Sequence, residues 1–322
     1  MKAAVVTESG LVLRDVSPPK PKPNEVLVRV RAASLNRADL SVAAGHAHGV
    51  IGGPGTIPGL EWAGEVAEAG PKAGGFAVGD RVMCSGSGGY AEYAVADHGR
   101  TNPIPAGMSF ETATTLPIAL QTMHDAIVTQ GRLQPGESIM IQGASTGVGL
   151  MALQIARLRG AAVVIGTSTN PERRARLAEF GATHAIDAGD PAWPDQVREA
   201  TGGEGVNVII DQVSASVANG NMRAASVLGR IVNVGRLGGT KGEFDYDLHA
   251  LKRISYVGVT FRTRSVDEVR EINRRMRDEL WDAVTNGTLH IPVDRSFSLD
   301  EVAGALDHMK ANGHFGKILL IP

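Results

Sequence analysis

Residues 141–157 read IQGASTGVGLMALQIAR, a short apolar run followed by a glycine-containing turn and then by apolar residues at helical spacing. The run that begins at Ser138 is typical of a buried β-strand, while Leu150, Leu153 and Ile155 predict a helix that is buried along much of its surface. The stretch is therefore a strand-to-helix junction. The first turn of such a helix presents unbonded backbone N–H groups and the positive end of the helix dipole, so it favours a phosphate as its ligand.

Two glycines in this turn are expected to permit close contacts. Gly147 and Gly149 remove Cβ atoms that would hold a ligand away from the backbone or separate the helix from its strand. The match to the dinucleotide fingerprint is incomplete, because Ala144 and Thr146 stand where its first two glycines belong. A glycine-rich turn that binds no ligand is the alternative interpretation.

Composition limits the possible functions. The chain has 322 residues, of which 43% are hydrophobic, which is enough for two domains. The formal net charge of -2 argues against nucleic acid or an anionic membrane as the main partner. Cys84 is the only cysteine, which excludes an intrachain disulfide and a cysteine-based zinc cage. The sequence shows neither a secretory leader nor a run long enough to span a membrane, so we expect a cytoplasmic protein.

Two patterns of secondary structure divide the chain. Residues 1–116 contain short β-type runs separated by proline and glycine, which predict a small, strongly bent antiparallel sheet or barrel. Residues 117–287 alternate apolar strands with helices, which predicts a Rossmann-type parallel sheet covered on both faces. Residues 288–322 end in a helix and a strand, and we expect them to return to the first domain and leave a cleft between two lobes.

The end of the second predicted Rossmann strand indicates which nucleotide is bound. NAD-specific folds place an acidic residue there, about 20 residues beyond the glycines. This chain has Thr167 and Ser168 instead, and the next helix opens with Arg173 and Arg174 in its first turn. Hydroxyl groups and arginine donors favour the 2′-phosphate of NADPH, which a carboxylate would repel. We therefore predict NADPH over NADH; the alternative is that the arginines form a solvated helix face.

Several short stretches together resemble the medium-chain dehydrogenase/reductase superfamily, and within it the zinc-free quinone oxidoreductase branch, the zeta-crystallin-like enzymes. They follow the family order along nearly the whole chain. The stretches are 33–39 (ASLNRAD), 58–64 (PGLEWAG), 79–82 (GDRV), 144–149 (ASTGVG), 252–255 (KRIS), 261–264 (FRTR) and 316–317 (GK). The resemblance implies an α/β protein with a doubly wound Rossmann sheet and a GroES-like, mostly antiparallel β-barrel domain.

The resemblance also bears on metal content and on assembly. Zinc-dependent members of the superfamily have a cysteine where this chain has Asn36 and a histidine where it has Leu60, and neither replacement is a good zinc ligand. We therefore predict no metal. The family implies a homodimer that joins two Rossmann sheets through edge strands, and we place residues 254–260 at that interface.

Three residues are candidate catalytic groups by resemblance. Asn36 would lie beside the nicotinamide or its ribose, and Asp39 would position that loop; the alternative for both is a turn-stabilising role. Thr122 falls where relatives have a cofactor-contacting threonine, and the alternative is a helix hydroxyl bonded to its own backbone. The nicotinamide amide would be contacted by backbone groups of a separate segment, Val234, Gly235 and Arg236.

The predicted cofactor-binding residues come from several segments of the chain. Arg262 would reach the substrate or the cofactor, with a surface salt bridge as the alternative. The full set is Asn36, Thr122, Ala144, Ser145, Thr146, Gly147, Val148, Gly149, Thr167, Ser168, Arg173, Val213, Val234, Gly235, Arg236, Phe261, Arg262, Phe315, Gly316 and Lys317.

Two departures from the family pattern concern the substrate and the adenosine end. Relatives often have a tyrosine soon after the Asn-x-x-Asp motif, but this chain reads Gly45-His46-Ala47-His48. A histidine in this loop could protonate a reduced product, and the alternatives are a solvated histidine or a proton from solvent. Relatives also often have a tyrosine near the adenosine phosphate, where this chain has Ala188, which increases the expected role of Arg173.

The predicted chemistry follows from the absence of zinc ligands. A quinone or an α,β-unsaturated ketone spreads incoming negative charge onto oxygen by conjugation, so hydrogen-bond donors and prompt protonation are sufficient. We therefore predict NADPH-dependent hydride transfer to a small conjugated carbonyl substrate. The alternatives are an ene reductase of unsaturated acyl thioesters and a regulatory protein that binds the nucleotide without turnover.

Overall fold

The computed structural model describes residues 1–49 and 51–322; Val50, in the predicted histidine- and glycine-rich loop, lies outside the described residues. The chain divides into two compact units. The first unit consists of Met1–Ile118 and Phe261–Pro322, and the second consists of Ala119–Thr260.

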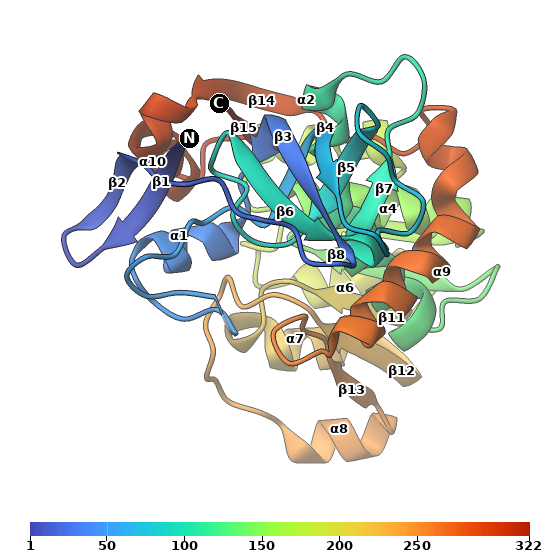
Figure 1. The fold of residues 1–322 in the computed structure, drawn as a ribbon. Coiled ribbons are helices and arrows are strands. Elements are labelled where there is room, and N and C mark those ends of the chain that lie inside the picture. Colours follow the sequence, from blue (N-terminus) through green and yellow to red (C-terminus); the bar gives the residue numbers. More distant parts are fainter. Residues whose placement is uncertain (50) are drawn as a thin grey trace. The chain divides into compact units, whose positions relative to one another are not determined.

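The first unit is built on a mostly antiparallel sheet (Figure 1). Its strand order is β14-β15-β3-β4-β5-β7, and β6 pairs with β3; among the strand pairs described, β14 and β15 alone run parallel. The strands are β1 (Lys2–Thr7), β2 (Gly10–Asp15), β3 (Glu25–Ser34), β4 (Glu61–Ala69), β5 (Arg81–Ser85), β6 (Tyr93–Asp97), β7 (Thr101–Pro103), β14 (Val293–Ser298) and β15 (Lys317–Ile321). The helices are α1 (Arg37–Ala43), α2 (Phe110–Ala113), α9 (Val266–Thr285) and α10 (Val302–Lys310), with short 3-10 turns η1 (His98–Arg100) and η5 (Leu299–Glu301).

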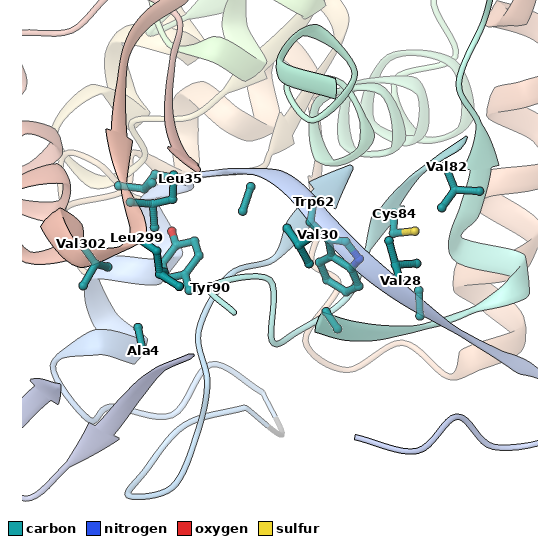
Figure 2. Close-up of a cluster of buried hydrophobic side chains, with 14 of the residues drawn as sticks. Ala4, Val28, Val30, Leu35, Trp62, Val82, Cys84, Tyr90, Leu299 and Val302 are labelled. Atoms are coloured by element: carbon teal, nitrogen blue, oxygen red, sulfur yellow. The ribbon is translucent and has the colours of Figure 1, made fainter. Parts of the chain in front are cut away.

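The core of the first unit lies on this sheet (Figure 2). Trp62 of β4 and Tyr90 are fully buried among aliphatic side chains from β3 and β5, such as Val28 and Val82. Cys84 is buried in the same cluster, and burial raises the pKa of its thiol to about 12. This cysteine packs as a small apolar residue, because a thiol with so high a pKa is almost never ionised at neutral pH.

Helix α9 belongs to the first unit, whereas the sequence pattern assigns residues 117–287 to the Rossmann domain. Two polar contacts explain the difference. Arg270 donates to Asp97 over 2.7 Å, and Asn273 exchanges two hydrogen bonds of 3.1 Å with Asn102 of β7. Both asparagines are buried, so the pairing satisfies amides that would otherwise be costly to bury. The divisions accordingly fall after residues 118 and 260 rather than after 116 and 287.

The second unit, whose strands β8, β11, β12 and β13 are labelled in Figure 1, has the predicted parallel sheet. Its strand order is β10-β9-β8-β11-β12-β13. Every pairing in it is parallel. The strands are β8 (Ser138–Gln142), β9 (Val163–Thr167), β10 (His184–Ile186), β11 (Val206–Asp211), β12 (Ala225–Asn233) and β13 (Ser255–Gly258). The connecting helices are α4 (Gly147–Leu158), α5 (Pro171–Ala175), α6 (Trp193–Glu199), α7 (Ala218–Ala224) and α8 (Tyr246–Lys252), with short turns η3 (Leu177–Phe180) and η4 (Ala215–Val217).

The strand order reverses direction between β8 and β11. The chain runs outward from β8 through β9 to β10, and then returns to the other side of β8 at β11. Open α/β sheets bind their ligands at such a switch point, outside the carboxyl ends of the strands. Helix α3 (Pro117–His124) and the π-helical segment η2 (Asp125–Gln130) precede this sheet, and the boundary between the units falls within α3.

Candidate functional site

The turn between β8 and α4 lies at the switch point of the second unit and is held by side chains from two other strand ends. Thr146 caps α4, since its hydroxyl accepts a hydrogen bond of 3.0 Å from the Gly149 N–H. The same hydroxyl donates over 2.8 Å to Gln212, which follows β11. Gly143 N–H donates over 3.1 Å to the hydroxyl of Thr167, the last residue of β9. The turn is therefore fixed on both sides of the switch point.

The close approach of helix to strand depends on Gly149. A Cβ atom on this residue would lie 2.6 Å from the carbonyl oxygen of Ala144, far inside van der Waals contact. The glycine lets the first turn of α4 pack directly on the turn that follows β8. Because the first N–H groups of a helix have no partner within the helix, this arrangement suits the diphosphate of a dinucleotide.

The residues predicted to select the nucleotide gather at the end of β9. Ser168 is buried, and its hydroxyl lies 3.1 Å from that of Ser145 in the glycine turn. Arg174 donates to the Ser168 carbonyl over 2.9 Å and pairs with Asp187 at 3.0 Å, so the Asp187 carboxylate is neutralised. Arg173 is half-buried in the first turn of α5. Thr167 is buried, and its hydroxyl supports the turn rather than facing solvent.

The predicted nicotinamide-binding segments follow β11 and β12. Val213 N–H donates over 2.8 Å to Asp211, and Val234 N–H donates over 2.8 Å to the Asp211 carbonyl. Gly235 lies against the same carbonyl, with its N–H at 3.1 Å, and Arg236 is exposed. The structure therefore brings these predicted residues together around Asp211.

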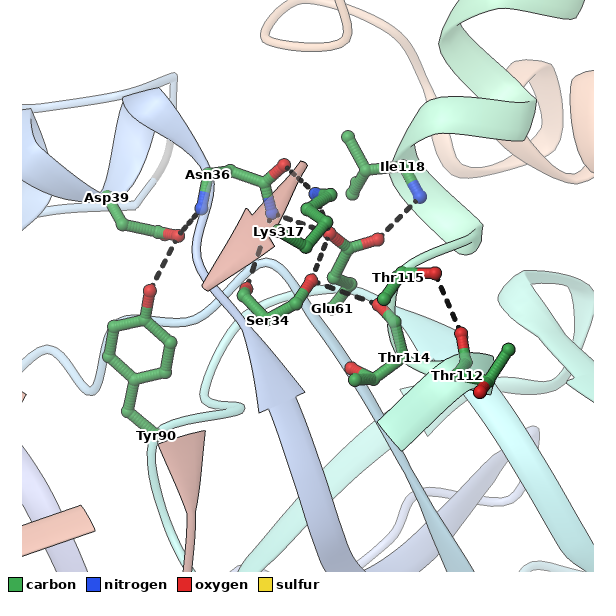
Figure 3. Close-up of polar contacts among 10 residues, drawn as sticks. All are labelled: Ser34, Asn36, Asp39, Glu61, Tyr90, Thr112, Thr114, Thr115, Ile118 and Lys317. Atoms are coloured by element: carbon green, nitrogen blue, oxygen red, sulfur yellow. Dashed lines mark hydrogen bonds and ion pairs between the residues drawn. The ribbon is translucent and has the colours of Figure 1, made fainter. Parts of the chain in front are cut away.

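A buried carboxylate organises the candidate site of the first unit (Figure 3). Glu61 opens β4 and is fully buried, and it pairs with Lys317, whose side chain is only 5% exposed. Three further donors reach it: Ser34 Oγ at 2.6 Å, Asn36 Nδ2 at 2.9 Å and the Ile118 N–H at 2.8 Å. A buried ion pair is stable only when its remaining hydrogen-bonding positions are filled, as they are at Glu61.

The same cluster fixes the orientation of the Asn36 amide. Its nitrogen donates to Glu61 and its oxygen accepts from Lys317 Nζ at 2.9 Å. Lys317 reaches this place because β15 begins directly after Gly316, where a Cβ atom would lie 2.1 Å from the Pro292 carbonyl oxygen. The sequence predicts both Asn36 and Lys317 as site residues, and the structure brings them together.

Asp39 and Tyr90 hold the loop that carries Asn36. Asp39 Oδ2 accepts from the Asn36 N–H at 2.7 Å and from the Tyr90 hydroxyl at 2.8 Å. Burial raises the pKa of Asp39 to about 6, although both donors favour its ionised form. Burial and the neighbouring Asp39 carboxylate together raise the pKa of Tyr90 well above its usual value. Asp39 thus acts on the site through the backbone of Asn36.

The raised pKa of Asp39 predicts a pH-dependent contribution to stability. Because the folded pKa of about 6 exceeds the ordinary value of 3.8, the contribution is fully present below pH 3.8 and is lost as the pH rises through 6. The unfolding free energy of the wild type should fall by about 2–3 kcal/mol across this pH range, and Asp39→Asn should abolish that fall. Urea unfolding of both proteins from pH 4 to pH 7 measures it.

Tyr90→Phe provides the control for this pH prediction. The variant removes a donor that favours the ionised carboxylate, so the pKa of Asp39 should rise further and the loss of stability should move to higher pH. Parallel pH profiles for the wild type and Asp39→Asn would show that another group is responsible.

The remaining predicted residues are Thr122, Phe261, Arg262 and Phe315. Thr122 is half-buried in α3 of the second unit. Phe261 and Arg262 begin the second segment of the first unit, and Arg262 packs against Gly49. Phe315 is buried, and its N–H donates over 3.0 Å to Asp294. These contacts give Phe315 a structural role beside Gly316 and Lys317.

His48, in the histidine-containing loop, is partly buried. Partial burial, with a smaller contribution from the charge of Arg262, lowers the pKa of His48. The imidazole is therefore mostly neutral at neutral pH, which reduces the fraction available to donate a proton.

The two sites also contain polar residues that are not among the sequence predictions. Glu61 and Tyr90 are in the first unit, and Asp211, Gln212 and Ser214 are in the second. Glu61 and Asp211 are the first and last residues of strands, and an acidic residue at the end of an apolar strand is the one signal that could have indicated them. Nothing local to Tyr90 identifies its partner, which lies 51 positions away.

The donor set at these sites does not resemble a metal centre. Among the described residues, no group of three or more His, Cys, Asp or Glu side chains is placed to hold a metal ion. Asn36 has its amide engaged by Glu61 and Lys317, and Leu60 provides no donor atom.

In the part of the chain that the structure covers, no helix combines the length and apolarity needed to cross a membrane.

Comparison with known proteins identifies the family. The alcohol dehydrogenase GroES-like domain matches residues 22–106, and the zinc-binding dehydrogenase family matches residues 147–278. Quinone oxidoreductase-like protein 2 of Rattus norvegicus is 30% identical over 322 residues, which cover 99% of this chain and 91% of that protein. The chain belongs to the medium-chain dehydrogenase/reductase superfamily. The predicted resemblance to its quinone oxidoreductase branch is confirmed.

Two further similarities place this superfamily member among its relatives. An alcohol dehydrogenase superfamily protein from Novosphingobium aromaticivorans has the same fold, with a TM-score of 0.90, 29% identity and coverage of 100% of this chain and 99% of that chain. Highly reducing polyketide synthase 40 of Fusarium pseudograminearum is 30% identical over 302 residues, which are 92% of this chain but only 12% of that protein. The predicted combination of a Rossmann sheet and a GroES-like domain is confirmed, and the chain is an oxidoreductase of a nicotinamide-dinucleotide-binding family.

Proposed function

We propose that this chain is an NADPH-dependent oxidoreductase that transfers hydride to a quinone or another conjugated carbonyl without a metal. One observation carries the proposal. Asn36, at the position where zinc-dependent relatives have a cysteine, is held by Glu61 and Lys317 in a hydrogen-bonded cluster. An amide and a paired ammonium group donate hydrogen bonds but do not act as a strong Lewis acid. The acceptor must therefore spread the incoming charge itself, as a conjugated carbonyl does.

The residues of this chain would bind and orient the cofactor. A reduced nicotinamide supplies the hydride when it is bound. The N–H groups at the start of α4 would hold the diphosphate, and Gly149 permits the close approach. Asn36 and Lys317 would contact the nicotinamide end of the cofactor from an arrangement that Glu61 keeps rigid.

The preference for NADPH rests on the residues around the end of β9. This strand ends at Thr167 and is followed by Ser168, and the nearby Asp187 is paired with Arg174. We expect Arg173→Ala to reduce the preference for NADPH over NADH by about tenfold, because a guanidinium–phosphate contact is charge-assisted. Comparison of kcat/KM for the two nucleotides measures the change.

Arg176→Ala is the matched control for the nucleotide preference. Arg176 follows α5 and pairs with Glu179 at 3.0 Å on the surface, so its removal should leave the ratio unchanged. A wild-type enzyme that oxidises NADH as efficiently as NADPH would contradict the assignment, as would equal effects of the two variants.

A second candidate function is reduction of unsaturated acyl thioesters. One observation favours it: the match to a polyketide synthase covers 92% of this chain at 30% identity. Such a substrate is also a conjugated carbonyl, so it would use the same cofactor and the same hydride direction. Exposed Arg236 and Arg262 would favour an anionic acyl carrier.

A panel of three acceptors tests the proposal. NADPH consumption is measured with a para-quinone, an alkyl enone and a crotonyl thioester, and NADPH binding is measured separately by calorimetry. Turnover of the quinone or the enone above the thioester supports the proposed function, and the reverse order supports the second candidate. Binding without turnover of any acceptor would indicate a nucleotide-binding regulatory protein. No binding would contradict all three.

We also propose that the enzyme is a cytoplasmic homodimer joined through β13. This strand lies at the end of the described sheet order; Tyr256 on it is 36% exposed, and Leu251 of the preceding helix α8 is 74% exposed. An apolar edge strand is suited to pairing with a second copy. We expect Tyr256→Lys to shift sedimentation from a dimer to a monomer. A wild-type monomer, or a variant that remains a dimer, would rule out this interface.

A further inference from the structure

The loops that follow β11 and β12 are joined backbone to backbone. Leu237 N–H donates over 3.1 Å to the Gln212 carbonyl, and Gly238 N–H donates over 2.7 Å to that of Val213. A Cβ atom on Gly235 would lie 2.6 Å from the Gln212 carbonyl oxygen, so the two chains touch there. We call residues 211–215 and 233–239 the paired loops. They lie at the carboxyl edge of the sheet, on the opposite side of β8 from β9.

Ser214, within the paired loops, has a strained backbone. Its φ of 70° and ψ of -121° lie outside the regions that L-residues ordinarily adopt. Strain of this kind costs free energy and persists only where the surroundings hold the residue in place. A glycine would adopt the same backbone angles without this cost.

Three hydrogen bonds hold Ser214 in this conformation. Its N–H donates over 2.8 Å to Asp211, which is fully buried. Its hydroxyl donates over 2.7 Å to the Gly235 carbonyl and accepts from the side-chain amide of Asn233. Ser214 thus connects the loop after β11 to the loop after β12. A serine at this position costs backbone free energy that a glycine would not. The hydroxyl group, which makes two of these bonds, is what the serine provides and a glycine would lack.

We propose that Ser214 is a positioning residue that fixes the backbone of Val234 and Gly235 for the nicotinamide carboxamide. The inference rests on the proposed function, because it assigns the nicotinamide half of the cofactor to the paired loops. A dinucleotide lies across the switch point, so its adenosine half meets the β8 and β9 side and its other half meets the β11 and β12 side. Loss of the Ser214 hydroxyl should therefore affect only one half of the ligand.

Two substitutions separate the hydroxyl from the backbone strain. Ser214→Ala removes both hydroxyl bonds and keeps the strained backbone, whereas Ser214→Gly removes the same bonds and relieves the strain. Calorimetry measures binding of NADPH and of 2′-phospho-ADP-ribose, which lacks the nicotinamide. Thermal unfolding measures the stability of each variant.

We expect the glycine variant to melt several degrees above the alanine variant, with both binding NADPH about tenfold more weakly than the wild type. Binding of 2′-phospho-ADP-ribose should stay within about twofold. A structural role alone would make the two affinities fall together and recover with stability in Ser214→Gly, which would overturn the inference while leaving the proposed function intact. A wild-type protein that binds neither ligand would overturn the proposed function and this inference with it.

Discussion

Lys317→Met is expected to lower the free energy of unfolding by about 3–5 kcal/mol, because it leaves the Glu61 carboxylate buried without a cation. Lys317 is 5% exposed and Glu61 is 0% exposed, so neither group can recover hydration by a change of rotamer. The substitution also removes the hydrogen bond that the Asn36 amide oxygen accepts from Lys317. Urea unfolding measures the stability, and the NADPH affinity should fall together with it.

The double variant Glu61→Gln/Lys317→Met distinguishes an unpaired charge from a loss of packing. A glutamine removes the buried charge and keeps an oxygen acceptor for the Ile118 N–H; with its amide nitrogen in the place of Oε1, it can donate to the Asn36 amide oxygen that Lys317 no longer reaches. It should recover most of the lost stability. If the double variant is no more stable than Lys317→Met, the lysine acts mainly through its aliphatic chain, and the electrostatic account is wrong.

The parallel sheet could be predicted because its signal is local. The alternation of apolar strands with helices is set by nearby residues, and parallel strands joined by helices permit few other arrangements. The strand-to-helix turn could be predicted for the same reason, since Thr146, Gly147 and Gly149 all lie within one short segment. The structure begins α4 at Gly147, within the glycine-containing turn.

The polar clusters could not be predicted because their partners are distant in sequence. Glu61 and Lys317 are 256 positions apart, and the apolar residues around each give no information about the other. The division of the chain by contacts places α9 in the first unit, and the difference from the sequence prediction has a similar reason. The periodicity of the helix reveals which face is buried, but only the pairing of Asn273 with Asn102 shows what covers that face. Family resemblance supplied Asn36 and Lys317 as site residues, whereas the role of Glu61, which accepts hydrogen bonds from both, was visible only in the structure.

Gly149→Ala is expected to disrupt the nucleotide site through a single added carbon. Its Cβ would meet backbone atoms of Ala144 at 2.6–2.7 Å, and a backbone cannot move aside as a flexible side chain can. The first turn of α4 must shift away from the strand, which should cost about 1–3 kcal/mol of stability. The same shift moves the N–H groups proposed to bind the diphosphate, so NADPH should bind roughly tenfold to a hundredfold more weakly.

Gly304→Ala makes the same chemical change at the same place in another helix. Gly304 is the third residue of α10, as Gly149 is the third residue of α4, but it is exposed and its nearest neighbour would be a Phe297 ring carbon at 4.0 Å. Alanine favours the helix here and meets no obstacle, so stability should rise by about 0.5–1 kcal/mol with no change in NADPH affinity. Effects of the same sign at both positions would mean that helix propensity, and not the contact with Ala144, decides the role of Gly149. Effects of opposite sign on stability would show that Gly149 is required because the turn has no room for a Cβ atom at this position.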